Sequence, residues 1–361
     1  IGSITVPDNV TVKVLKVWYI CSLDSSENTS MELKNGTKGL NIASTTLNLM
    51  FGNNSTTSSY NIYNRRHLES IRRVSTSGKT YKLCNNIDLY GTDWTPVATF
   101  YGTFNGDMHT ITNMTIKIPQ NLALTNYGLF GENRGIVKRL LVYNVNISSV
   151  EKYEKTNVYV GGIVGTNRGT IDDCRVSGRI VCKRAYSAIG GIAGASIDGT
   201  IENSLVSNLY MYGNGDIGGI VGVVYNGEIN DCSTHSMTLE LYSKYVNRSV
   251  GGIAGYLANG SIVQYCYNEA GKINFIDYDE IAWDEIAPRM GIIVGGMNDS
   301  TVRNVSVEGV TLSKGKLPEK TNNGNIFHVW YYPCRYIGKY GDGAVGNSEG
   351  ASTITGTGWQ P

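Results

Sequence analysis

The stretch that decides the fold is GGIVGTNRGTIDDC, which occupies residues 161–174. Two glycines open it, the apolar pair Ile163 and Val164 follows, and Gly165 closes the pair. Glycine permits positive φ angles and also lets one backbone approach another closely. The stretch therefore predicts short strands that stack tightly on their neighbours.

This motif returns six times along the chain. The copies begin at Tyr127, Gly161, Gly190, Gly218, Gly251 and Gly291. The glycine at the fifth position recurs at intervals that run from 28 residues (Gly194 to Gly222) to 40 residues (Gly255 to Gly295). Such periods are typical of solenoids, so we expect one elongated repeat fold and not several globular domains.

The second half of each copy predicts a corner. An apolar residue, two polar residues and a small residue follow one another, as from Ile171 to Cys174. A separation of three breaks the period of two that a straight strand needs, and Asn and Asp tolerate the left-handed conformation of a corner. We therefore expect a parallel β-solenoid with three short strands per coil. An inward ladder would hold Leu140, Cys174, Ser204, Cys232, Cys266 and Val305, and a structural corner ladder would hold Asp173, Asn203, Asp231, Tyr265 and Asn304.

Composition excludes several classes of protein. The chain has 361 residues, 44 of them Gly and 7 Pro, with 17% charged residues and a formal net charge of +1. A chain with so little charge is neither a charged disordered tail nor a nucleic-acid-binding surface. No apolar run approaches the roughly 20 residues that span a bilayer. We expect a monomer without nucleic-acid partners or membrane insertion in this segment, which begins at Ile1 and is interpreted as part of a larger or processed protein.

The repeats resemble a known family. GGIVGTNRGTIDDCRVSGRI and GGIVGVVYNGEINDC look like the GLUG repeat, and NIDLYGTDW followed by FYGTFNGDMHTITNMTI is similar to the segment that commonly precedes GLUG arrays in bacterial surface proteins. The resemblance covers roughly residues 61–312. It implies an all-β fold, a right-handed parallel β-helix, on a secreted or surface-anchored bacterial protein. Adhesin-like proteins and the non-catalytic regions of some IgA1-specific metallopeptidases belong to this family, which carries no catalytic residues to transfer.

Two departures from the family pattern fall at the ends of the array. Tyr127 and Ile292 replace a motif glycine in the first and last copies. Terminal coils of solenoids are atypical, so these departures agree with the repeat interpretation.

The chain divides into three parts. Residues 1–60 alternate in polarity and predict a small β-rich N-terminal domain or leader, residues 61–312 form the β-helix, and residues 313–361 form a C-terminal cap or linker. At the start of the second part, four apolar residues lie on one helical face and predict a short helix that covers the open end of the solenoid: Ile62, Leu68, Ile71 and Val74.

The cysteines and histidines indicate no metal or cofactor site. There is no C-x-x-C, and the four His residues are scattered, so zinc-ligand spacing is absent. Cys174, Cys232 and Cys266 recur at one repeat position and are interpreted as small buried hydrophobes. The sequence leaves open whether Cys21, Cys84, Cys182 and Cys334 form disulfides.

Signatures of catalysis are absent, so we do not expect an enzyme. The chain has no H-E-x-x-H, no G-x-S-x-G and no P-loop. One alternative is a glycan-processing β-helix enzyme, a polysaccharide lyase or glycoside hydrolase, whose carboxylates would come from the acidic segment holding Asp277, Asp279, Glu280, Asp284 and Glu285. A solvated acidic loop explains that segment more simply. Another alternative is a structural stalk of a larger surface protein.

Insertions suggest where a ligand binds. Between the corner and the next motif glycine the copies vary in length, so the extra loops must project from one side of the solenoid. Aromatic residues of this region form the candidate ligand-binding set: Tyr186, Tyr210, Tyr212, Tyr242, Tyr245, Tyr278 and Trp283. Tyrosine is also an ordinary half-buried strand residue. The functional hypothesis is an extracellular adhesin or binding segment on a bacterial cell surface, which contacts a host or environmental glycan or surface protein through these rings.

Overall fold

The computed structural model describes residues 51–52, 55–150, 156–242, 248–276 and 289–314, and five short strands between residues 321 and 359. Of residues 312–314 and these five strands it describes the backbone. The predicted N-terminal β-rich region and most of the predicted C-terminal cap lie outside the described residues.

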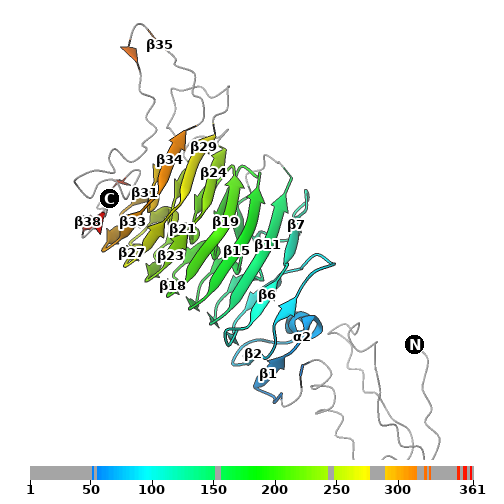
Figure 1. Ribbon diagram of the computed structural model, residues 1–361. Helices are drawn as coiled ribbons and strands as arrows, with labels where there is room; N and C mark the ends of the chain where they lie inside the picture. Colours follow the sequence, from blue (N-terminus) through cyan, green and yellow to red (C-terminus); the bar gives the residue numbers. More distant parts are fainter. Residues whose placement is uncertain are drawn as a thin grey trace, which may run out of the picture.

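Coils of parallel strands stack along one axis, as Figure 1 shows from the cyan coils to the orange ones. One coil consists of β12 (Val158–Gly161), β13 (Val164–Asn167), β14 (Thr170–Asp172) and β15 (Arg175–Cys182), and each strand belongs to a different sheet. The predicted parallel β-solenoid is confirmed. The expectation of three strands per coil is wrong, because a corner at Gly162 separates β12 from β13 and gives the coil a fourth strand.

We name the four parallel sheets A to D. Sheet A contains, in spatial order, β1 (Ser59–Ile62), β2 (Thr80–Leu83), β5 (Thr103–Asn105), β10 (Ile136–Lys138), β14, β18 (Thr200–Glu202), β22 (Glu228–Asn230), β27 (Ile262–Gln264), β32 (Thr301–Arg303) and β38 (Thr353–Thr355). Sheet B contains β3 (Ile87–Asp88), β6 (Thr110–Thr112), β7 (Thr115–Ile118), β11 (Leu141–Ser149), β15, β19 (Leu205–Gly213), β23 (Ser233–His235), β24 (Thr238–Tyr242), β28 (Tyr267–Glu269), β29 (Lys272–Ile276), β33 (Ser306–Glu308), β34 (Thr311–Lys314) and β39 (Gly358–Trp359).

Sheet C contains β4 (Val97–Phe100), β9 (Phe130–Asn133), β13, β17 (Ala193–Ile197), β21 (Val221–Tyr225), β26 (Ala254–Ala258), β31 (Val294–Asn298) and β37 (Ser348–Glu349). Sheet D contains β8 (Asn126–Tyr127), β12, β16 (Ser187–Gly190), β20 (Asp216–Gly218), β25 (Ser249–Gly251) and β30 (Arg289–Gly291). A separate antiparallel pair joins β35 (Thr321–Asn322) and β36 (Asn325–Ile326).

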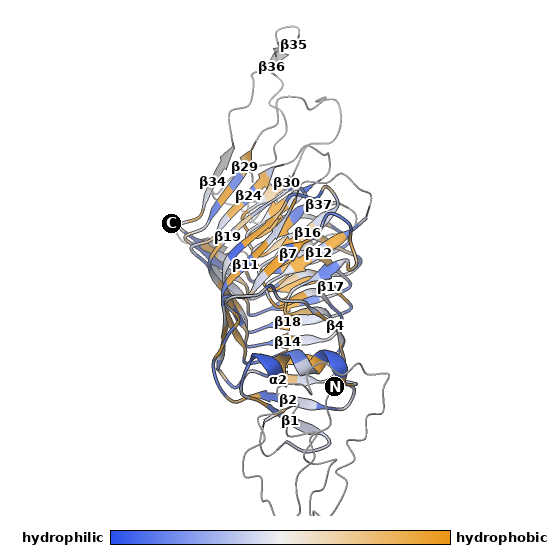
Figure 2. Cartoon of the chain, turned by 90° about the vertical axis from the view of Figure 1, so that its right-hand side faces the viewer, coloured by the Kyte–Doolittle hydropathy of each residue, from blue (hydrophilic) through white to orange (hydrophobic). Residues whose placement is uncertain are grey.

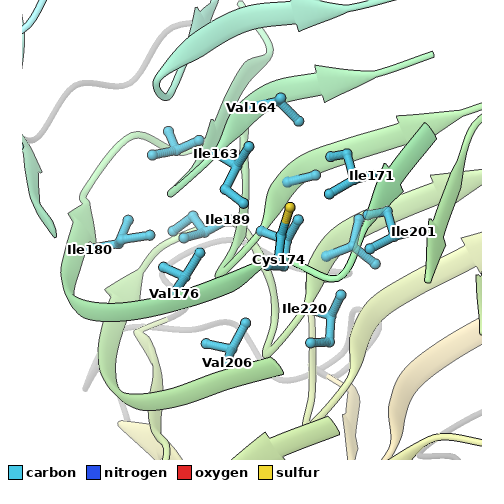
Figure 3. Close-up of a cluster of buried hydrophobic side chains, with 14 of the residues drawn as sticks. Ile163, Val164, Ile171, Cys174, Val176, Ile180, Ile189, Ile201, Val206 and Ile220 are labelled. Carbon is cyan, nitrogen blue, oxygen red and sulfur yellow. The ribbon is translucent and has the colours of Figure 1, made fainter. Parts of the chain in front are cut away.

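Identical repeat positions stack in register and fill the interior. The central residue of each three-residue strand from β5 to β32 in sheet A points inward, as in the pairing of Ile171 with Ile201 and of Ile201 with Ile229, and all three are fully buried. The predicted inward ladder is confirmed, since each member from Leu140 to Val305 is at most 2% exposed. Figure 3 shows Ile163, Cys174 and Ile201 converging in this core, and Figure 2 shows β12 and β16 as predominantly hydrophobic strands.

Corners between sheets A and B use left-handed residues, as the spacing predicted. The φ angles are 46° at Asp173, 51° at Asn203 and 53° at Tyr265. The Asn203 amide donates a hydrogen bond to Asp172 Oδ1 on the preceding coil at 2.9 Å. Corner side chains therefore join consecutive coils.

A short helix precedes the regular coils. α2 (Arg65–Ser70) begins at Asn64, whose side chain accepts a hydrogen bond from the His67 backbone N–H, and a 3-10 turn, η2 (Ile71–Arg73), ends it. Leu68 and Ile71 are buried as predicted, whereas Ile62 belongs to β1. β1 pairs with β2 in sheet A, so the helix replaces the other strands of the first coil (Figure 1).

Candidate functional site

The ends of the sheet B strands carry a group of outward aromatic side chains. A second left-handed position, Asn208 with φ 50°, bends β19 and separates its first part from its second. Beyond the bend, Leu209 and Met211 are buried, while Tyr210 and Tyr212 alternate with them and point outward. Strand geometry thus places both rings on one surface.

We call this surface the tyrosine face and define it by Arg179, Tyr210, Tyr212, Glu240 and Tyr242. The register stacks Arg179 beside Tyr210 and Tyr212 beside Glu240. The rings of Tyr212 and Tyr242 lie 6.0 Å apart between centroids with an interplanar angle of 21°. Neighbouring coils therefore contribute rings with similar orientations.

Charged neighbours hold these rings in place. The Arg179 guanidinium carbon lies 5.2 Å from the Tyr210 ring centroid, and Lys183 Nζ lies 5.8 Å from that of Tyr212. The Tyr210 hydroxyl donates to Glu240 Oε2. Burial and this carboxylate raise the pKa of Tyr210 to about 12, so its hydroxyl remains a donor at neutral pH. Such contacts lower the entropy lost when a ligand stacks on the rings.

The predicted site residues divide between two surfaces. Tyr210, Tyr212 and Tyr242 meet on the tyrosine face. Tyr186 is half-buried before β16 of sheet D, and the Arg248 guanidinium carbon lies 5.0 Å from its ring centroid. Tyr245, Tyr278 and Trp283 lie outside the described residues, as does the acidic segment from Asp277 to Glu285.

The insertions lie on one side of the solenoid, as the sequence predicted. Each insertion falls between the end of a sheet B strand and the start of a sheet D strand. The first joins β7 to β8 and the last joins β29 to β30, and their lengths differ. All insertions therefore leave the solenoid at the edge between sheets B and D.

Sequence reasoning missed a cluster of carboxylates around Glu202 on sheet A. Asp172 and Glu202 are register partners on consecutive coils, and Glu228 and Asp231 lie close enough to act on the Glu202 carboxyl. Partial burial, first, and then these three carboxylates raise the pKa of Glu202. Of the sheet A strands, only β14 and β18 end on an acid, and Glu228 and Asp231 occupy other repeat positions, so no single column of the repeat shows this cluster in the sequence.

Within the described part of the chain, no group of three or more His, Cys, Asp or Glu side chains is arranged to hold a metal ion. No helix among the described residues has the length and apolar character to cross a membrane.

Known proteins share the repeat and the fold. A family model described as the GLUG motif matches residues 156–181, which span β12 to β15. The chain is 30% identical over 158 residues to a halomucin of Haloquadratum walsbyi, and 29% identical over 127 residues to a candidate Gly-rich membrane protein of Evansella cellulosilytica. These alignments cover 40% and 32% of this chain but only 2% and 14% of the relatives, so the chain matches a small part of each.

A solved structure has the same architecture. The crystal structure of a candidate immunoglobulin A1 protease from Bacteroides ovatus matches with a TM-score of 0.52, covering 85% of this chain and 87% of that chain. At 17% identity this likeness shows the shared fold alone.

Proposed function

We propose that this chain, a GLUG-repeat β-solenoid, is a binding segment of an extracellular cell-surface protein and holds a glycan on its tyrosine face. The carrying observation is the set of outward rings of Tyr210, Tyr212 and Tyr242, positioned by cation and carboxylate neighbours. Surface location is supported by the names of the two relatives, a halomucin and a Gly-rich membrane protein.

Tyrosine suits glycan recognition for a physical reason. Its ring offers a rigid apolar surface to the C–H groups of a sugar, and its hydroxyl adds a polar contact at low entropic cost. Glu240 Oε1 accepts a hydrogen bond from Asn274 Nδ2 at 3.5 Å, while its other oxygen accepts from Tyr210. The carboxylate is thereby fixed beside the rings, where sugar hydroxyls can donate to it.

The decisive experiment is a glycan array followed by titration of the best glycan. We expect the double variant Tyr212→Ala and Tyr242→Ala to weaken binding by about tenfold or more, since each lost stacking contact costs roughly 1 kcal/mol. The matched control is Tyr90→Ala, which removes an exposed ring outside sheet B, 83% accessible. Equal affinity of the double variant and the wild type would refute the proposal.

The sheet A carboxylates favour a second candidate, a glycan-processing enzyme. Asp172 and Glu202 lie on adjacent strands, which are about 4.8 Å apart in a sheet, and glycosidases use paired carboxyl groups at comparable separations. The raised pKa of Glu202 suits a general acid. Incubation with mucin and with plant polysaccharides distinguishes the candidates: an enzyme releases new reducing ends that Glu202→Gln abolishes, and a binding segment releases none.

A further inference from the structure

Two cysteines of the inward ladder lie side by side on consecutive coils. Cys232 directly precedes β23 and Cys266 directly precedes β28, and these two strands pair in register. On one side of the pair the Asp231 backbone N–H donates a hydrogen bond to the Gln264 carbonyl at 3.2 Å, and on the other side the Tyr267 N–H donates to the Cys232 carbonyl at 2.9 Å. These bonds hold the two Cα atoms at the spacing of neighbouring strands, about 4.8 Å.

The two thiols have the same surroundings and the same orientation. Both side chains are buried. Each thiol donates to the carbonyl two residues earlier, Cys232 to Asn230 at 3.3 Å and Cys266 to Gln264 at 3.2 Å. A thiol is a weak hydrogen-bond donor, so breaking these contacts costs little. Both thiols are free in the structure, which therefore holds the pair in its reduced form.

The spacing of this pair suits a covalent bond, and that of the third ladder cysteine does not. Disulfides join Cα atoms that lie about 4.4–6.8 Å apart, a range that contains the strand spacing. Ser204 occupies the coil between Cys174 and Cys232, and its Oγ accepts a hydrogen bond from the Cys174 backbone N–H at 3.1 Å. Cys174 and Cys232 are thus about 9.6 Å apart, beyond the roughly 7 Å that a disulfide can bridge.

We propose that Cys232 and Cys266 form a disulfide that links consecutive coils when the chain folds under oxidising conditions. The reaction is a thiol–disulfide exchange with an external disulfide such as oxidised glutathione. One cysteine thiolate attacks the oxidant, forms a mixed disulfide and releases one glutathione thiol. The other cysteine thiolate then attacks the mixed disulfide and releases the second. The two cysteines lose two protons and two electrons, and the two glutathione thiols take them up.

Burial determines when the bond forms. Burial first, and then the neighbouring Cys266 thiol, raise the pKa of the Cys232 thiol well above its usual value. Because the thiolate is the reactive form, the folded pair reacts slowly, and a bond already formed is shielded from reductants. Oxidation therefore belongs to folding, before stacked coils exclude solvent from the sulfur atoms. An extracellular location, as proposed above, supplies the oxidising compartment, whereas the pairing itself depends on the fold and not on glycan binding.

Refolding the full chain in a glutathione redox buffer tests the bond independently of location. The refolded chain is denatured, alkylated with N-ethylmaleimide without reductant, and digested for mass spectrometry. We expect a joined pair of peptides that contain Cys232 and Cys266, with most of the N-ethylmaleimide label lost at both residues and full label at Cys174. The oxidised chain should also unfold about 5 °C higher than the reduced chain, because the bond restricts the unfolded state.

Variants at one repeat position supply the controls. Cys174→Ser removes a ladder cysteine and should leave the bond intact, whereas Cys266→Ser should restore full labelling of Cys232. Equal labelling of Cys232 and Cys174 in the wild type, or joining of Cys232 mainly to another cysteine, overturns the proposal. If the chain does not regain its β-sheet circular dichroism in vitro, it is secreted into a bacterial periplasm and alkylated in the same way, and the same outcomes decide.

Discussion

At the scale of single residues, the left-handed corner positions decide which side chains the repeat accepts. Asp173, Asn203, Asp231 and Asn304 all have φ angles near 50°, which short polar side chains tolerate because they bond to local backbone groups. Tyr265 occupies the same corner with φ 53° and is 53% exposed. Tyr265 therefore adopts a strained backbone conformation, and burial of its ring offsets little of that strain.

Replacing this tyrosine should stabilise the protein. We expect Tyr265→Asn to raise the free energy of unfolding by roughly 0.5–1 kcal/mol, since Asn relieves the left-handed strain. Urea unfolding followed by circular dichroism measures the change. Asn304→Asp is the control at an equivalent corner. It should change the free energy of unfolding little, because Asn and Asp both tolerate the left-handed conformation. A destabilised Tyr265→Asn variant would show that the exposed ring makes a stabilising contact.

Glu202 should make stability depend on pH. Its folded-state pKa is raised by partial burial and by the carboxylates of Asp172, Glu228 and Asp231. A raised acid pKa means that the folded state binds the proton more tightly, so stability is lost as pH rises from the unfolded pKa through the folded pKa. Glu202→Gln removes this loss and should stabilise the protein by about 0.5 kcal/mol at pH 7, with the advantage fading near pH 4. Unfolding at both pH values measures it, and an advantage that persists unchanged at pH 4 contradicts the electrostatic cause.

At the scale of strands and sheets, glycines let sheets C and D lie against each other. A Cβ atom at Gly194 on β17 would lie 2.2 Å from Val160 N and 2.6 Å from the Tyr159 carbonyl carbon on β12. Gly165 and Gly222 meet the backbone of sheet D in the same way. Positive φ occurs at five other glycines, Gly78, Gly91, Gly178, Gly260 and Gly309. Of the two properties of glycine that the sequence offered, the bracketing glycines therefore use close approach and not positive φ.

One methyl group at this contact should disrupt the coil. We expect Gly194→Ala to lower the free energy of unfolding by roughly 3 kcal/mol, because the methyl group meets rigid backbone atoms. Gly271→Ala is the matched control, since its nearest neighbour is the Asn268 side chain at 3.2 Å. Thermal unfolding of both variants measures the difference, and equal midpoints would mean that the sheets separate at little cost.

At the scale of the whole molecule, stability comes from stacking each coil on its neighbours. β18 pairs with strands on both sides, β14 and β22, whereas β1 pairs with β2 alone in the described structure. In such a fold the energy is close to a sum over neighbouring repeats. Two chemically different surfaces share this scaffold: tyrosines on sheet B and carboxylates on sheet A.

Hydrogen exchange should report this arrangement. We expect amides of β14, β18 and β22 to exchange slowest and amides of β1 to exchange fastest among the sheet A strands, since an end coil opens without disturbing two neighbours. Mass spectrometry of exchanged peptides resolves these segments. Uniform protection from β1 to β22 would instead indicate a fully cooperative molecule.

The repeat predicted most of the fold but only part of the candidate site. Inward positions, such as those of Ile201 and Cys232, and corner positions, such as that of Asn203, recur at the same spacing in each copy of the repeat. Tyr186 and Tyr212 both belong to the variable region that predicted the ligand site, yet Tyr186 lies just before a sheet D strand, beside Arg248. Its placement depends on where the chain turns after the sheet B strand, which varies from coil to coil.

The sequence alone determined that this chain is a parallel β-solenoid with an inward ladder, left-handed corners and insertions on one edge. Those properties follow from the repeat, because each copy has the same pattern of apolar, polar and glycine positions and therefore the same burial and backbone conformation. Tertiary structure alone decided that a coil has four strands and that Tyr212 meets Tyr242 across coils. It also decided that Asp172 lies beside Glu202 on sheet A and that Ser249 lies beside Arg289 on sheet D. These contacts join residues 30 or more apart, and the variable length of the insertions hides their register from the linear sequence.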